Sequence, residues 1–304
     1  QDFLPSLRWQ DLLRGGGDSP SPTGLVVLLL QHFLCELYGS LYLLRQLVVI
    51  GILAALLQRL SSSFGIKGVV DLAFAVCFIV LVILGLQSFQ IASSVATGFM
   101  YSLIPMLSSL LVAVGGVTSA TIFHPLLWAL VGGIAGLVQN LLLPMILLST
   151  AFSLMSHFST DLAFPRLGNL VRQGVITVLA LFFIIFSGFM VVRGAIAPVA
   201  DGITLRTAKY LTKTFIPIAG GIFGLLMITF MVATPVIKVF AMVVVYKIVG
   251  AILEPLCDKR IVQVLGTVEA SLTLVLIALA TVAMMLFLAI VILVGIGNLA
   301  VFMR

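Results

Sequence analysis

The chain has 304 residues, of which 62% are hydrophobic and only 9% are charged, and its formal net charge is +6. Water-soluble domains contain about 45–50% apolar and about 25% charged residues, so this composition excludes an ordinary soluble protein. The apolar stretches are long and do not alternate with polar residues, which predicts an all-α, polytopic transmembrane helical bundle rather than a barrel.

The N-terminal residues differ from the rest of the chain. Residues 1–14 place leucines and a tryptophan among charges and are expected to form a short amphipathic helix. The sequence GGGDSPSPTG follows and is typical of a linker. We therefore expect an N-terminal region, residues 1–23, and a single transmembrane domain, residues 24–304. Because the chain begins with Gln1, we also expect that a signal peptide has been removed.

The next apolar stretches are expected to be separate membrane segments. Residues 24–38 carry polar side chains and are predicted to lie at the membrane interface. Residues 41–60 and 69–91 are long enough to span. Residues 99–114 form a short segment that Gly115 and Gly116 close.

The middle stretch, residues 126–155, is long but interrupted. Gln139 and Asn140 lie at its centre, with Pro144 just beyond them. Each half has about 14 residues, which at 1.5 Å per residue is too short to cross a bilayer alone. The sequence leaves two interpretations open, one kinked helix or two half-helices in a re-entrant hairpin.

The second half of the chain continues the pattern. Residues 156–173 are a polar connection with a short amphipathic helix, and residues 257–266 are a charged turn. Pro235 is expected to divide two apolar segments. The spans predicted here are residues 175–192, 216–234, 236–256 and 272–297. About six to eight membrane segments are expected in all.

Lysines inside apolar stretches are candidate functional residues. Lys247 lies near the centre of its stretch, where a lysine costs about 2.5–3.5 kcal/mol if it faces hydrocarbon. Glu254 follows seven residues later on the same helix face, and Lys238 points to the opposite side. These residues are candidates for lining a pore or for contacts between copies. The alternative, a lysine that snorkels from an interfacial helix, stays open.

Motifs of catalysis are absent from the sequence. His124 precedes Pro125 and is expected to lie at the start of a helix. A metal site is not expected there, because no second histidine, cysteine or carboxylate lies at metal-binding spacing. There is no metalloprotease motif, paired nucleophile or phosphate-binding loop. We therefore expect that the protein is not an enzyme and that it binds no cofactor, metal or nucleic acid. The basic residues are expected to contact membrane lipids.

The sequence TKTFIPIAGGIF, residues 212–223, marks a predicted bend or close contact. Pro217 fits the first turn of a helix, where its missing N–H costs nothing. Gly220 and Gly221 each cost about 1 kcal/mol relative to alanine in a plain helix. Small residues allow helices to approach closely, and the other pairs are Gly115 with Gly116 and Gly132 with Gly133.

Several stretches together resemble the stage III sporulation protein AE family. They are GGVTSATIFHP (115–125), VADGITLRTAKYLTKTFIPIAGGIF (199–223), VVYKIVGAILEPLCDKRIV (244–262) and FLAIVILVGIGNLAVFMR (287–304), with FLPSLRWQDLL near the start. The likeness is collinear over most of the chain. The family pattern continues after GGIF with a small polar stretch, which this chain lacks after Phe223. A similar join is expected at residues 96–99.

The resemblance implies a polytopic protein of endospore-forming bacteria, in the mother-cell membrane that surrounds the forespore. Its members belong to a channel complex, or feeding tube, between the two cells and support forespore development. Other stage III A proteins and a forespore-side protein are the implied partners.

A membrane component that assembles as a homo-oligomeric ring is the leading expectation, since one bundle of this size has little room for a wide conduit. The alternative is a secondary transporter for small metabolites, with half-helices around Gln139 and Pro217 forming a midplane site. Carboxylates within the spans, common in ion-coupled transporters, are almost missing. A third interpretation is a membrane scaffold without a pore.

Overall fold

The computed structural model describes residues 22–64, 67–114, 133–134, 136–155, 164–200, 222–257 and 259–302. Within these ranges the chain is helical, which confirms the predicted all-α fold class. The elements are α2 (Pro22–Gly39), α3 (Leu41–Phe64), α4 (Lys67–Val114), the π-helical turn η1 (Val138–Leu142), α6 (Leu143–Met155), α7 (Phe164–Ala200), α9 (Ile222–Leu253) and α10 (Lys259–Phe302).

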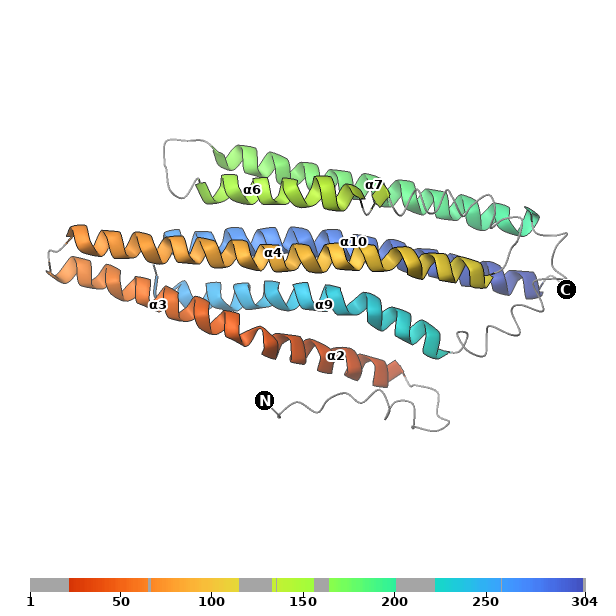
Figure 1. Cartoon of the computed structure of the whole chain (residues 1–304), viewed down its shortest axis with the longest axis horizontal. Coiled ribbons are helices and arrows are strands. Elements are labelled where there is room, and N and C mark those ends of the chain that lie inside the picture. The colour runs from red at the N-terminus through yellow and green to blue at the C-terminus, as the bar shows by residue number, and fades with distance from the viewer. Residues whose placement is uncertain are drawn as a thin grey trace.

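The long helices lie side by side in three layers (Figure 1). One layer holds α6 and α7, the middle layer holds α4 and α10, and the third holds α3 and α9, with α2 packed against α9. The central helix is α10, which contacts α4, α6, α7 and α9. The chain therefore buries its last helix most deeply.

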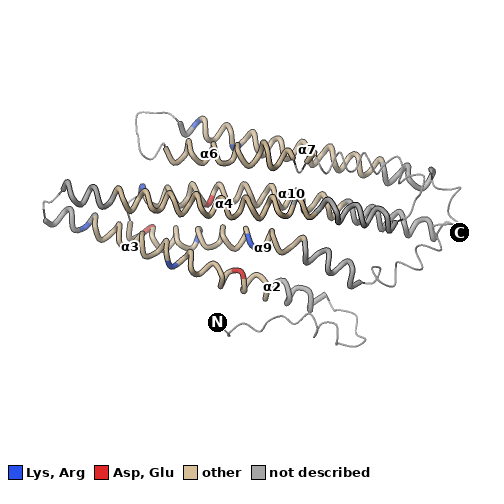
Figure 2. The backbone as a smooth tube through the Cα atoms, viewed as in Figure 1, with Lys and Arg blue, Asp and Glu red and all other residues tan. Residues whose placement is uncertain are grey.

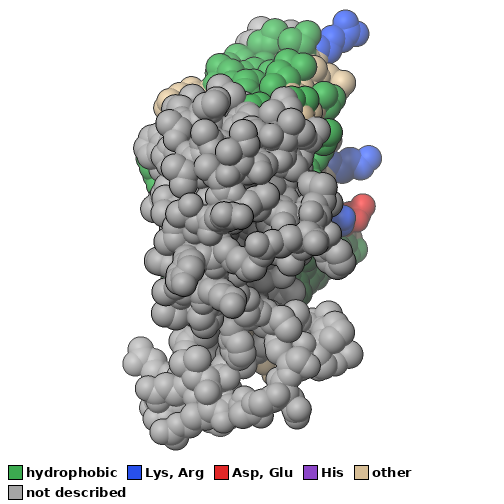
Figure 3. Space-filling model, turned by 90° about the vertical axis from the view of Figure 1, so that its right-hand side faces the viewer, with side chains coloured by type: hydrophobic (Ala, Val, Ile, Leu, Met, Phe, Trp, Pro, Cys, Tyr) green, Lys and Arg blue, Asp and Glu red, His purple; other side chains and the backbone are tan. Residues whose placement is uncertain are grey.

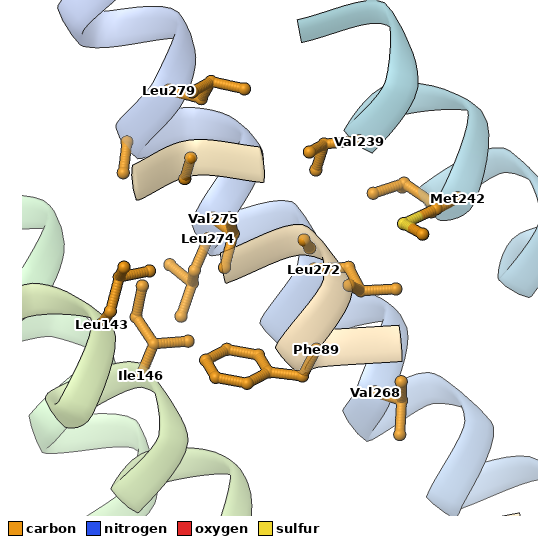
Figure 4. Packing of buried hydrophobic residues seen from close by; sticks show 14 of the residues in the cluster. Phe89, Leu143, Ile146, Val239, Met242, Val268, Leu272, Leu274, Val275 and Leu279 are labelled. Atoms are coloured by element: carbon orange, nitrogen blue, oxygen red, sulfur yellow. The ribbon is translucent and has the colours of Figure 1, made fainter. Parts of the chain in front are cut away.

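The core follows the helical period of α10. Val268, Leu272, Val275 and Leu279 recur every three or four residues and are buried, as expected for one face of an amphipathic helix. Figure 4 shows this face meeting side chains of three other helices: Phe89 of α4, Leu143 and Ile146 of α6, and Val239 and Met242 of α9. Apolar side chains fill the space between these helices.

Five helical segments are long and apolar enough to cross a membrane. They are Ala75–Phe99, Val138–Met155, Arg166–Val192, Val232–Leu253 and Lys259–Leu288. The segments Leu30–Gly39 and Leu41–Leu57 form one further candidate, bent by 43° between α2 and α3. Counting this pair, the described residues supply up to six spans, the lower end of the predicted range.

Two predicted segments, residues 69–91 and 99–114, are one continuous helix, so the expected division between them is wrong. Serines and a threonine lie between the two segments. Their hydroxyl groups donate to carbonyls of the preceding turn, as Thr97 does to the Ser93 carbonyl oxygen at 3.0 Å and Ser94 to that of Ile91 at 2.8 Å. A hydroxyl satisfied in this way is compatible with an uninterrupted helix.

Other predicted boundaries are also wrong. Pro235 lies inside α9 and does not divide it. A proline removes one helical hydrogen bond, and packing of the flanking turns against neighbouring helices holds the segment together; Figure 1 shows that α9 is curved. The amphipathic segment before residue 175 is the start of α7, and most of the predicted charged turn 257–266 is the start of α10.

Gly85 of α4 is a point of close helix contact. A Cβ atom built there would lie 2.5 Å from Cγ2 of Val268 on α10. Gly85→Leu is therefore expected to destabilise the protein by about 1–3 kcal/mol through overpacking. The measurement is the midpoint of thermal unfolding in detergent.

Gly188→Leu on α7 is the matched control, because no atom lies within 4 Å of a Cβ at Gly188. Equal midpoints for the two variants would show that α4 and α10 do not meet closely at Gly85.

Candidate functional site

The outer surface of α9 carries the charged residues that the sequence singles out. Lys247 and Ala251 of α9 are exposed, and so is Glu254, the first residue after the helix. The N–H of Glu254 donates to the Gly250 carbonyl oxygen, which continues the helical spacing, so the three residues form one outward stripe. The opposite face, including Tyr246, Val249 and Leu253, is buried against the bundle. Lys247 therefore points away from the interior of its own chain.

Lys238 has different surroundings. It is half-buried, between the buried Val239 and the half-buried Ile237. The two lysines thus have different environments, as expected because nine residues, or two and a half turns, place them on opposite sides of the helix. A role in lining a pore or in contacts between copies stays a prediction for Lys238, Lys247 and Glu254.

Next to Lys247, the bundle interior holds paired hydroxyl groups. The hydroxyls of Ser88 on α4 and Tyr246 on α9 share a hydrogen bond of 2.8 Å, and Ser88 also donates to the Leu84 carbonyl oxygen at 3.0 Å. Buried polar groups are costly unless they are bonded, and these are bonded.

A second hydroxyl pair joins α6 to α10. Thr150 and Ser271 share a hydrogen bond of 2.5 Å, and Ser149 donates to the carbonyl oxygen of Gly168 on α7 at 2.9 Å. Gly168 permits this approach, because a Cβ there would lie 2.8 Å from the Ser153 hydroxyl oxygen. Neither hydroxyl pair was predicted from the sequence, because the two residues of each pair are far apart in the chain.

The hydroxyl pairs and several charged residues share one level along the bundle axis. Lys247 adjoins Tyr246, Glu269 lies two residues before Ser271, and Arg166 lies two residues before Gly168. One set of hydrogen bonds joins α4 to α9, and another joins α6 to α7 and α10. Gly85 of α4 lies against Val268 of α10, and these two helices run in the same direction (Figure 1), so both sets and the charged residues beside them lie at a similar height. We call this cross-section the polar layer, defined by Ser88, Ser149, Thr150, Tyr246 and Ser271.

The predicted break around Gln139 and Asn140 is a π-helical turn. The N–H of Leu143 donates to the Val138 carbonyl oxygen, five residues back. Pro144 has no N–H for the Asn140 carbonyl, and a widened turn accommodates this missing bond. The chain continues as a helix through both amides, so the segment is a kinked helix here and does not reverse. Asn140 and Pro144 are exposed and Gln139 is half-buried.

The remaining candidates for helix breaks lie outside the described residues. They are Gly115, Gly116, His124, Pro125, Pro217, Gly220 and Gly221. The predicted N-terminal helix over residues 1–14 also lies outside them.

The turn between α9 and α10 is fastened to α3 by a cysteine. The thiol of Cys257 donates to the Gly51 carbonyl oxygen, with a sulfur–oxygen distance of 3.2 Å. Burial raises the pKa of the Cys257 thiol, so less thiolate is present near neutral pH. The thiolate is the reactive form, and modification is therefore expected to be slow at pH 7 and to accelerate as the pH rises.

A variant with Cys35 and Cys77 replaced by serine tests this expectation in detergent. At pH 7, an uncharged maleimide should react more slowly with Cys257 in the folded protein than after unfolding in dodecyl sulfate. Equal rates in the two states would show that burial does not protect the thiol.

Comparisons with known proteins agree with the resemblance in the sequence. Residues 8–224 and 220–297 match the family model described as "Stage III sporulation protein AE". The chain is 34% identical over 317 residues to the stage III sporulation protein AE of Bacillus subtilis (strain 168), an alignment that covers 95% of this chain and 79% of the relative. No solved structure matches.

The boundaries of these matches relate to the small polar stretch that the family pattern has after GGIF and this chain lacks. The family match divides at residues 220–224, next to the join after Phe223. The alignment with the relative spans 317 positions, more than the 304 residues of this chain, so the relative contains residues that this chain lacks.

Proposed function

Because the chain belongs to the stage III sporulation protein AE family, whose members act in sporulation, we propose that it is the membrane core component of a channel complex between mother cell and forespore. In this proposal the protein is not an enzyme. Copies of the chain assemble as a ring in the mother-cell membrane around the forespore and support forespore development. Other stage III A proteins and a forespore-side protein are its partners.

The main observation behind the proposal is that the side chain of Lys247 faces outward. Lys247 belongs to the candidate span Val232–Leu253 and is exposed on the outside of the bundle. An exposed lysine on the outer surface can pair with an acidic group on a neighbouring chain. A second copy offers such a neighbour, since Glu254 of the same exposed stripe has the opposite charge.

The composition of the described core supports a path between copies. Between α4, α6, α9 and α10 the core consists of apolar side chains and bonded hydroxyl pairs. A conduit for polar solutes needs polar walls, and the outward stripe of α9 supplies charged groups. Closed cyclic assembly would bring such stripes together around or between subunits.

A transporter is the second candidate. Its support is the π-helical turn Val138–Leu142, which places two amides at an irregular point of a candidate span. Irregular backbone in a membrane is tolerated beside protein or a water-filled cavity, and transporters place substrate sites there.

Deletion of the gene in the organism that encodes the chain tests the proposal. The deletion strain should form forespores that fail to mature, and the unmodified gene should restore heat-resistant spores. A small fluorescent solute loaded into the mother cell should enter the forespore only in the restored strain. Passage of the solute in the deletion strain would contradict a channel role.

A further inference from the structure

The charged residues coloured in Figure 2 gather toward one end of the bundle, and Arg193 of α7 lies far from them along that helix. On α7, no charged residue lies between Arg172 and Arg193, a distance of about 30 Å at 1.5 Å per residue. On α10, none follows Glu269 up to the end of the helix at Phe302, and on α9 none precedes Lys238. On α7 the uncharged stretch therefore has about the thickness of the hydrocarbon core of a bilayer.

The three helices place this boundary at a similar height. The hydrogen bonds of the polar layer, together with the contact between Gly85 and Val268, set Arg166, Lys247 and Glu269 at a similar level. Lys238 and Arg172 lie about two turns further along their helices, toward the uncharged half. The end of the charged region is thus a property of the bundle and not of one helix.

The helices are too long for a bilayer to cover completely. With 44 residues, α10 is about 66 Å long, and the 37 residues of α7 make about 55 Å. The hydrocarbon core is about 30 Å thick, and helices tilt by at most about 40°. Even at that tilt, α10 extends about 50 Å along the bilayer normal, so part of the bundle must lie outside the hydrocarbon.

We propose that the hydrocarbon core surrounds the uncharged half, and that the charged half of the bundle projects beyond it. Arg172 and Lys238 lie at the boundary, where their long side chains reach the phosphate groups of the lipid headgroups. The proposal rests on the free energy of membrane insertion. Each charged side chain placed in hydrocarbon raises that free energy, and the uncharged half contains no charged side chain to do so. Figure 3 shows basic groups and an acidic group projecting from one side of an otherwise apolar described surface.

This placement does not depend on the channel proposed above. It leaves Lys247 and Glu254 in the projecting half, within reach of a second copy. The polar layer then lies just outside the hydrocarbon, a position that fits its content of hydroxyl groups.

Two exposed positions on α7 give a matched test. Leu170 is 70% exposed in the charged half and Ile184 is 65% exposed in the middle of the uncharged half. In full-length protein without native cysteines, Leu170→Cys and Ile184→Cys are placed in phosphatidylcholine–phosphatidylglycerol nanodiscs, where both membrane faces are open to water. A charged, water-soluble maleimide is the probe.

Leu170→Cys should react at least about tenfold faster than Ile184→Cys, because thiolate formation and probe access both require water. Gln263→Cys and Met284→Cys on α10 form a second exposed pair and should show the same difference. In dodecyl sulfate all four should react alike, which checks the probe. Equal rates within both pairs in nanodiscs would overturn the placement, whether all positions are labelled or all are protected.

Discussion

Tyr246→Ala is expected to destabilise the protein by about 3–5 kcal/mol, the range for loss of a large buried aromatic side chain. Tyr246 is 1% exposed and lies where α9 meets α4, with its hydroxyl bonded to Ser88. The variant leaves a cavity in the hydrophobic core. Unfolding by titration with dodecyl sulfate in mixed micelles measures the change in free energy.

Tyr246→Phe separates packing from hydrogen bonding. It keeps the ring and removes the hydroxyl, and Ser88 retains its bond to the Leu84 carbonyl oxygen. The expected loss is about 0.5–1.5 kcal/mol. If both variants lower the free energy of unfolding by the same amount, the ring of Tyr246 does not contribute through packing. That result would contradict the burial of Tyr246 between α9 and α4.

Lys247→Ala is expected to have the largest effect on assembly. In the proposed oligomer, Lys247 of one copy contacts a polar group of the next, and each 1.4 kcal/mol lost from that contact weakens association about tenfold. The number of heat-resistant spores should fall with it. Both the dissociation of the solubilised oligomer and the spore count are measured.

Lys259→Ala is the matched control, because Lys259 is also an exposed lysine but lies at the start of α10, off the α9 stripe. It should leave assembly and spore number close to those of the unmodified protein. Wild-type behaviour of both variants would remove Lys247 from the functional residues.

The fold class follows from composition, but the helix boundaries do not. The sequence predicted a division at Pro235, a division between residues 91 and 99, and an interruption at Gln139 and Asn140. In the structure a helix continues through each of them, since packing along a long bundle outweighs a local preference for a break. Such packing depends on helices far apart in the sequence and has no local pattern.

Within the candidate site, the exposed charged residues were predictable from the sequence and the buried hydroxyl pairs were not. The seven-residue spacing of Lys247 and Glu254 places them on one helix face, and the structure shows both exposed. The pairs Ser88–Tyr246 and Thr150–Ser271 join residues separated by 158 and 121 positions. Single serines and threonines in apolar stretches give no sign of which helix they will meet.

The molecular mass of the protein in nanodiscs or mild detergent tests the central claim most directly. The chain has a mass of 32.5 kDa, and the proposed ring predicts a particle containing several copies with a central opening. Light scattering gives the mass, and electron microscopy gives the symmetry. A single 32.5 kDa chain that carries a small metabolite across the membrane would contradict the ring and establish the transporter.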